Sequence, residues 1–286
     1  MKAIRFFGTT AVVSLCFISS LFAQYSGDSW AAVKGKGSGT VSFAYVETPG
    51  FVYKKNGQLT GICVDIMNDF VAYVNKTKGV KLSAKYVGDG SNFSGMYNKV
   101  KASSGGVFGL GNITITDARK GEVKFSPPFI TNFAVLITPP SVSTLSSMSN
   151  ISTTFAGLTA YTAKGTLNEK RLMAIKSKHY PNMKVSYVAS SPDALSKVLN
   201  DSKSFTYLDV AFYLDAIQNG KSVKRHPVGD QGSEKFGFIM PMNSDWQPLM
   251  DEFFAANGGY INSVEYKKIL AKHLGNTGVK LLQSVN

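Results

Sequence analysis

The chain has 286 residues and a formal net charge of +13 at pH 7, with 31 Lys and Arg against 18 Asp and Glu. The basic residues are scattered, without a long basic run or a repeat of basic and aromatic residues, so the charge does not indicate a nucleic-acid partner. The three histidines are far apart and lack metal-ligand spacing, and we expect neither a metal nor a cofactor.

The first 23 residues have the layout of a secretory signal peptide. Lys2 and Arg5 give a positive start, an apolar stretch covers 11–22, and a small residue suited to cleavage follows. The stretch is too short for a membrane-spanning helix, which needs about 20 apolar residues. We therefore expect an exported, soluble, periplasmic chain in which Cys63 is the one remaining cysteine, so that no internal disulfide can form.

Short β-like runs alternate with amphipathic helical patterns along the chain, which favours a layered α/β fold. Met67, Phe70 and Val74, for example, recur at helical spacing. In chain order, the first α/β unit is predicted to contain a strand over 41–46, a helix over 64–75, a strand over 82–87, a helix around 93–100, a glycine-studded apolar run over 107–115 and a strand over 133–138.

A Ser- and Thr-rich segment over 141–154 indicates a connector, and a second α/β unit follows it. Thr166 lies three residues before Glu169, a capping-box signature of a helix start, and Ser191 before Pro192 indicates another. The predicted elements are a strand over 158–163, a helix to 178, a strand over 184–188, a helix over 191–200, a mixed strand and helix start over 205–212, a strand over 236–240, and closing helices around 249–254 and 266–274, the last ended by Gly275.

Strands 133–138 and 236–240 flank the second unit, and they form a two-stranded hinge if both cross between the units. We therefore predict an α/β fold of two lobes joined by that hinge. Its parts are a signal peptide over 1–23, a discontinuous lobe 1 over 24–136 plus 237–286, and lobe 2 over 137–236. Two hinged lobes with a cleft between them are suited to closing on a small ligand.

A resemblance to a known family enters at residues 111–119, Gly-Asn-Ile-Thr-Ile-Thr-Asp-Ala-Arg, followed by Val-Lys-Phe-Ser-Pro-Pro-Phe at 123–129. This run resembles a signature of amino-acid-type periplasmic solute-binding proteins (type II, bacterial extracellular solute-binding protein family 3) and of the ionotropic glutamate receptor ligand-binding core. Weaker resemblances follow in the family's order at 49–51, 57–65, 164–166 and 260–275, so that about residues 40–275 are covered. The resemblance implies a type II periplasmic binding protein fold that captures an amino-acid-like ligand for an ABC permease.

Three residues near the central motif are candidates for the ligand's head group. Arg119 carries a planar guanidinium that can bind a carboxylate through two parallel hydrogen bonds, although a surface arginine after a capped turn is an equal alternative on the residues alone. The resemblance favours carboxylate binding. Thr114 could join through its hydroxyl and backbone N–H, and the carbonyl of Asn112 could accept from an ammonium; Thr114 could equally be a plain strand residue.

Other candidates lie elsewhere in the chain. Thr166 starts a helix whose positive end favours an anion, and backbone N–H groups after Gly165 could bind the ligand's acidic end; an ordinary helix cap is the alternative. Asp209 matches the family's second-lobe acid, which implies pairing with an α-ammonium, while a carboxylate at a helix start is the alternative. Phe51, or else Tyr53, could cover the apolar part of the ligand or pack in the core.

Three functions fit this sequence. The first is a monomeric transport receptor for an ABC permease. The second is an enzyme on the same scaffold, such as a dehydratase, because a fold does not fix a function. The chain shows no Ser/His/Asp or Cys/His pairing and no phosphate loop, so we expect no catalytic residues and no enzyme activity. The third is a ligand-sensing domain, which the sequence does not separate from a transport receptor.

Overall fold

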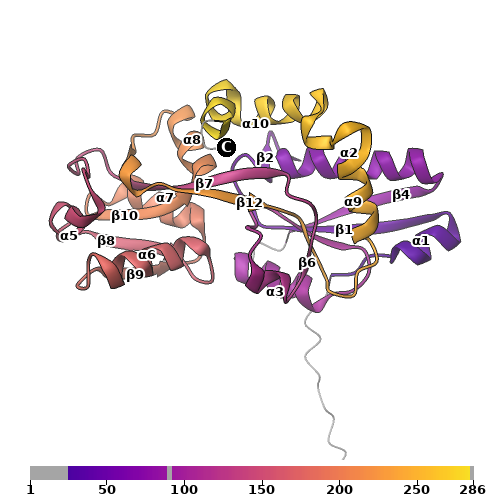
Figure 1. Cartoon of the computed structure of the whole chain (residues 1–286), viewed down its shortest axis with the longest axis horizontal. Helices are drawn as coiled ribbons and strands as arrows, with labels where there is room; N and C mark the ends of the chain where they lie inside the picture. The colour runs from indigo at the N-terminus through magenta and orange to yellow at the C-terminus, as the bar shows by residue number, and fades with distance from the viewer. Residues whose placement is uncertain (1–24, 89–91, 284–286) are drawn as a thin grey trace, which may run out of the picture.

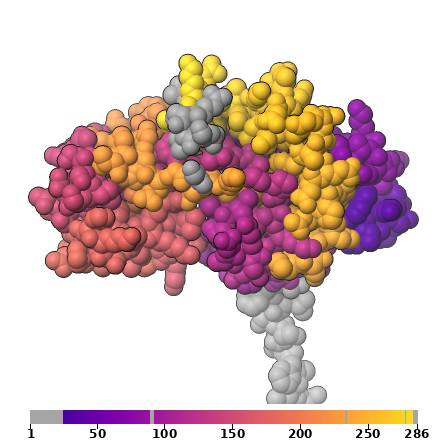
Figure 2. Space-filling model, viewed as in Figure 1, coloured from indigo at the N-terminus to yellow at the C-terminus, as the bar shows by residue number. Residues whose placement is uncertain are grey.

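The computed structural model describes residues 25–88 and 92–283, so the predicted signal peptide over 1–23 lies outside the described residues. The described chain folds into two α/β lobes that lie side by side and are linked by two long antiparallel strands, β7 and β12 (Figure 1). In the space-filling view the lobes touch along one face (Figure 2). Over the part of the chain that is described, no helix has the length and apolarity needed to span a bilayer.

The first lobe is built on a five-stranded sheet. Its order is β4 (Lys81–Gly88), β1 (Ser38–Tyr45), β5 (Val107–Leu110), β13 (Ile239–Met240) and β6 (Lys124–Phe125). β1 is parallel to β4 and β5, and β13 is antiparallel to β5 and β6. Every residue of β5 is buried, as expected for a strand covered on both faces. The helices of this lobe are α1 (Trp30–Lys36), α2 (Ile62–Lys78), α3 (Phe93–Ala102), the short α4 (Asp117–Lys120) and α9 (Gln247–Ala255).

The second lobe has its own sheet, in which every residue of the central strand β10 is buried. The order is β11 (Lys224–Arg225), β7 (Ile130–Thr138), β10 (Ser204–Asp209), β8 (Thr159–Ala163) and β9 (Lys184–Val188). β10, β8 and β9 run parallel, and β7 is antiparallel to β10. The helices are α5 (Ile151–Thr154), α6 (Leu167–Lys178), α7 (Ser191–Asn200) and α8 (Val210–Gln218). A separate apolar core, which contains Phe155 and Phe205, fills this lobe.

The hinge differs from the predicted one in its second strand. β12 (Gln231–Phe236) pairs antiparallel with β7 and is the return crossing, whereas the predicted strand over 236–240 ends as β13, which belongs to the first-lobe sheet. Both crossing strands therefore exist, as predicted, but the return strand begins earlier. Glu234 and Lys235 carry charges that hide its periodicity from a search for apolar runs.

The C-terminal helix α10 (Val264–Gln283) spans the two lobes, shown in yellow at the top of Figure 1. It contacts α2 of the first lobe and α8 of the second. Gly275 breaks it with φ 67° and ψ 169°, so this glycine ends a helical segment as predicted, and a further segment continues beyond it. Gln218 Nε2 of α8 donates to the carbonyl of Leu274 at 2.9 Å, which fixes the break against the second lobe.

The local helix signals are largely confirmed. Thr166 is the N-cap of α6, and its Oγ1 accepts from the backbone N–H of Glu169 at 3.1 Å. The cap of α7 is Ser190, one residue before the predicted Ser191. The features that were not predicted include helix α1, the short elements α4, α5, β6 and β11, and a hairpin of β2 (Tyr53–Lys55) and β3 (Gln58–Thr60). Its Asn-Gly turn, with φ of 52° and 78°, is a recognisable two-residue hairpin signal.

Candidate ligand-binding site between the lobes

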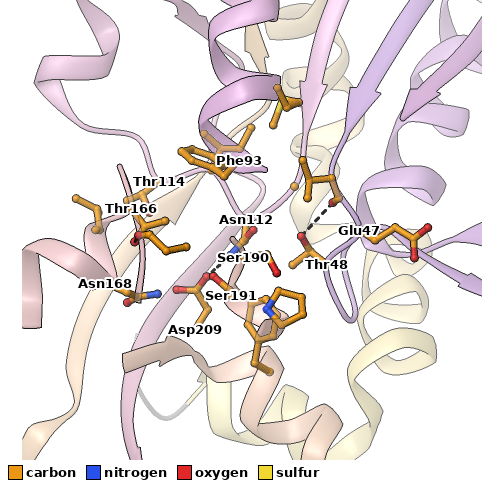
Figure 3. A pocket seen from close by; sticks show the side chains of 18 of the residues that line it. Glu47, Thr48, Phe93, Asn112, Thr114, Thr166, Asn168, Ser190, Ser191 and Asp209 are labelled. Atoms are coloured by element: carbon orange, nitrogen blue, oxygen red, sulfur yellow. Dashed lines mark hydrogen bonds between the residues drawn. The ribbon is translucent and has the colours of Figure 1, made fainter. Parts of the chain in front are cut away.

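A cavity lies between the two lobes and contains about 680 Å³ of space outside the protein atoms, part of it open to solvent. That volume lies within the range of small-molecule sites, which is roughly 300–1,000 Å³. The polar and aromatic lining from the first lobe comprises Glu47, Thr48, Phe93, Asn112, Thr114 and Arg119, and that from the second comprises Thr166, Asn168, Arg171, Ser190, Ser191, Asp209 and Phe212. Figure 3 shows most of these side chains converging from both lobes. Five of the seven predicted ligand-binding residues therefore share one cavity.

Several helices begin at this cavity. Phe93 is the first residue of α3, Asn168 lies in the first turn of α6, Ser191 is the first residue of α7, and Asp209 is the N-cap of α8. The N-terminal end of a helix carries partial positive charge and unpaired backbone N–H groups. The cavity is therefore suited to a ligand that carries an anionic group.

Arg119 is the cationic side chain of the first-lobe wall. Its Nη1 donates to the carbonyl oxygen of Thr114 at 3.0 Å, and its Cζ lies 5.0 Å from the centroid of the Phe93 ring, which holds the guanidinium plane in place. Burial lowers the pKa of Arg119, while the nearby Tyr97 and Asp209 oppose that shift. The salt bridges recorded among the described residues include none to Arg119, so its fork retains donors for a carboxylate.

Asp209 is the acid of the second-lobe wall, at the end of β10, and it is 5% exposed. Its Oδ2 accepts from Asn112 Nδ2 across the cleft (Figure 3), and its Oδ1 accepts from Asn132 Nδ2 at 3.2 Å. Burial raises the pKa of Asp209 above its ordinary value of 3.8, although Asn112, Arg171, Asn132 and Asn168 all act against the increase. The carboxylate is thus a desolvated acceptor held by amide donors.

A buried network connects this acid to the hinge. Arg171 of α6 forms a salt bridge with Glu234 of β12, and its Nη1 donates to Asn168 Oδ1 at 2.6 Å. Asn132 of β7 bonds Asp209 and also lies 3.5 Å from Glu234 Oε2. Sequence reasoning missed all four residues of this network, Arg171, Asn168, Asn132 and Glu234. The one available signal was Asn132, an amide inside a largely apolar strand.

Phe51 does not lie where it was predicted. Its side chain is 1% exposed and packs against the rings of Phe236 and Phe129, at centroid distances of 5.6 and 6.4 Å. The backbone N–H of Phe51 donates to the carbonyl of Thr48 in a tight turn, which directs the ring into the first-lobe core and away from the cavity. The aromatic residues that do line the cavity are Phe93 of the first lobe and Phe212 of the second.

Gly165 also lies outside the cavity lining. Its own backbone N–H donates to Glu169 Oε2 at 2.6 Å and so is already paired, whereas the predicted donors were the N–H groups after it, at the start of α6. Its φ of 79° fits glycine, and Ser94 Oγ of the first lobe donates to the neighbouring Lys164 carbonyl at 3.2 Å. This turn therefore contributes a contact between the lobes, and Thr166 alone of the predicted pair lines the cavity.

Glu47, and Tyr53 as the predicted alternative to Phe51, lie in different places. Glu47 lines the cavity rim, but it forms a salt bridge with Lys54 at 3.2 Å, and Figure 3 shows its carboxylate directed away from Asp209. Tyr53 does not line the cavity; its hydroxyl lies 3.0 Å from Nδ1 of His273 in α10. Neither residue is therefore placed over the head-group region.

Comparisons with known proteins agree with this fold. Residues 41–276 match the model of the bacterial extracellular solute-binding proteins, family 3. A search of curated proteins found no match. The arginine-, lysine-, histidine-binding protein ArtJ from the thermophilic bacterium Geobacillus stearothermophilus superimposes with a TM-score of 0.65 at 20% identity, over 83% of this chain and 96% of that one.

Two other solved structures show the same likeness. The GluR0 ligand-binding core from Nostoc punctiforme, in complex with L-glutamate, has a TM-score of 0.62 at 16% identity and covers 82% of this chain and 99% of that one. A structure from work on glutathione import via GshT and the cystine ABC importer TcyBC of Streptococcus mutans has a TM-score of 0.66 at 20% identity, over 82% and 95% of the two chains. The predicted two-lobed α/β fold of the type II periplasmic binding proteins is confirmed.

Proposed function

This chain belongs to family 3 of the bacterial extracellular solute-binding proteins, and from that premise we propose that it captures an amino acid or related zwitterion between its lobes for an ABC permease. The observation that carries the proposal is the pairing of opposite charges across one cavity. Arg119, without a carboxylate partner among the recorded salt bridges, faces it from the first lobe, and Asp209 faces it from the second. A zwitterion presents a carboxylate and an ammonium that complement these two groups.

The two lobes have different roles in this proposal. Arg119 and Thr114 hold the carboxylate on the first lobe, where Phe93 adds an apolar wall. Two contacts form only when the lobes close. Asp209 then accepts from the ammonium, and the start of α6 at Thr166 contacts the anionic group of the ligand. Closure is favoured by contacts that exist in the closed form and are absent from the open form.

The remaining parts of the proposal concern export and domain boundaries. A family of extracellular solute-binding proteins implies export, which supports the assignment of 1–23 as a signal peptide and a periplasmic location. We place the discontinuous lobe 1 over 24–136 plus 237–286 and lobe 2 over 137–236, with β7 and β12 as the hinge that crosses between them. Residues 134–137 of β7 pair with β10, so this part of the hinge lies against the second lobe. The protein is proposed to act as a monomer.

The test is a thermal-shift screen of the purified protein against the common amino acids and dicarboxylates, followed by calorimetry on the hits. A ligand that binds only the folded state raises the melting temperature by mass action. Arg119→Ala should weaken the binding of the hit by about 30-fold or more, because truncating one partner of a desolvated charge pair costs about 2–5 kcal/mol.

Lys120→Ala is the matched control, since Lys120 is the next residue of α4 and its side chain is 58% exposed. Wild-type affinity in a folded Arg119→Ala protein would refute the site. Chemical analysis of the ligand recovered after binding separates the two functions. A binding protein returns the ligand unchanged, whereas a dehydratase-like enzyme converts it.

A further inference from the structure

One hydrogen bond in the cavity occupies the position that the proposed function assigns to the ligand's ammonium. Asn112 Nδ2, on the first-lobe loop after β5, donates to Oδ2 of Asp209 at the end of β10 in the second lobe (Figure 3). We propose that Asn112 is an internal substitute for the ammonium: it closes the ligand-free lobes and leaves Asp209 when an ammonium-bearing ligand enters. This inference rests on the proposed function and names a residue that controls which ligands the site prefers.

Among the donors to Asp209, Asn112 is the one that can leave when the lobes separate. A carboxylate offers about four lone-pair positions. Asn132 fills one from the hinge strand β7, and Asn168 of α6 also hydrogen-bonds this acid. Both donors belong to the second lobe or the hinge, so they remain with Asp209 when the lobes separate. Asn112 is the first-lobe donor recorded to this carboxylate among the described residues.

The bond between Asn112 and Asp209 is also the stronger of the two side-chain hydrogen bonds recorded between the facing walls of the two lobes. The other joins Ser94 Oγ to the Lys164 carbonyl at 3.2 Å, where both partners are neutral and the site is exposed. Hydrogen bonds to an ionised acceptor are roughly twice as strong as those between neutral groups. Asp209 is 5% exposed, so water competes little for its oxygens while Asn112 is in place. Loss of the Asn112 amide should therefore shift the ligand-free protein toward an open arrangement.

The same competition affects ligand choice. An ammonium brings a full charge and three N–H donors, so it can displace a neutral amide from Asp209, but the ligand-free state has to give up the Asn112 bond. A deaminated analogue of the same ligand, with a hydrogen in place of the amino group, has no donor for Asp209 and leaves Asn112 where it is. Asn112 therefore penalises an amino acid relative to its deaminated analogue.

The experiment compares the wild type with Asn112→Ala and Asn112→Asp, and uses Asn182→Ala, at an exposed position, as the matched control. Small-angle scattering of the ligand-free proteins should give a compact wild type and control and an expanded Asn112→Ala. Asn112→Asp faces Asp209 with a like charge and should expand as well, so it provides the same test if the alanine variant does not fold.

Calorimetry at pH 7 then uses the amino acid found in the thermal-shift screen and its deaminated analogue. The ratio of the two affinities should shift toward the amino acid by about tenfold or more in Asn112→Ala, the value of one hydrogen bond to a charged group. Ligand-free variants as compact as the wild type, or an unchanged affinity ratio, would overturn the inference. The scattering needs no ligand, so failure of every amino acid to bind would reject the proposed function and leave the substitute role to be judged from scattering alone.

Discussion

His226 ties the Ser- and Thr-rich connector to the hinge strand, and its protonation should destabilise the second lobe in mild acid. The side chain is fully buried; its Nδ1 accepts from the backbone N–H of Leu145 at 3.0 Å, and its Nε2 lies 2.8 Å from Oγ1 of Thr138. Because Nδ1 is an acceptor, the neutral ring carries its proton on Nε2. Burial, with a smaller effect from Lys224, lowers the pKa of His226 from 6.5 to about 4.

The direction of the pH effect follows from where protons bind. Between pH 6.5 and about 4 the unfolded chain protonates this histidine and the folded chain does not, so stability falls as the pH falls through that window. Since each pKa unit corresponds to about 1.4 kcal/mol, the loss attributable to His226 is about 3 kcal/mol. At pH 7, above this window, the free energy of unfolding has not yet lost the part that depends on His226.

Urea unfolding followed by circular dichroism at several pH values between 7 and 4 measures this loss. His226→Gln should be less stable than the wild type at pH 7, because it lacks one or both ring contacts, but it should lose about 3 kcal/mol less over the acid window. His179→Gln, at an exposed histidine, is the control and should follow the wild type. Parallel losses in wild type and His226→Gln would show that another group controls acid stability.

Two further predictions concern the site. The affinity for an ammonium-bearing ligand should fall as the pH is lowered through the raised pKa of Asp209, because only the ionised acid attracts the ammonium. Calorimetry over this range should show the dependence in the wild type and not in the weaker-binding Asp209→Asn; an equal slope in both would reject the assignment. Glu234→Gln removes the carboxylate that pairs with buried Arg171, and it should lower the free energy of unfolding by about 3 kcal/mol or more. A loss below about 1 kcal/mol in urea unfolding, typical of an exposed pair, would contradict that role.

Local signals in the sequence were sufficient for much of the fold. The capping box at Thr166 was predictable because its two members lie within one helical turn and act without the rest of the fold. The helix stop at Gly275 has the same origin, since a left-handed φ is a property of one residue. The offset between Ser190 and Ser191 at the α7 cap reflects two adjacent serines, either of which can cap.

The aromatic wall of the cavity and the partners of Asp209 were harder to predict from the sequence, because both depend on tertiary position. Phe51 and Phe93 both sit beside polar loops in the sequence, and only the fold decides that the first enters the core and the second the cavity. The Arg171–Glu234 pair joins residues from a helix and a distant hinge strand, for which local periodicity carries no information. Arg119, by contrast, was found because its motif and its partner Thr114 are close together in the chain.

The arrangement around Asp209 suggests how ligand charge is sensed by the hinge. Asn132 lies on β7 and Glu234 on β12, so the acid is connected to both crossing strands through side chains of the hinge itself. A ligand's ammonium replaces only the Asn112 contact, and the rest of the network holds the carboxylate in the same position throughout. The second-lobe half of the site is therefore preorganised, and the free energy of closure depends on which donor, Asn112 or the ligand, reaches Asp209 from the first lobe.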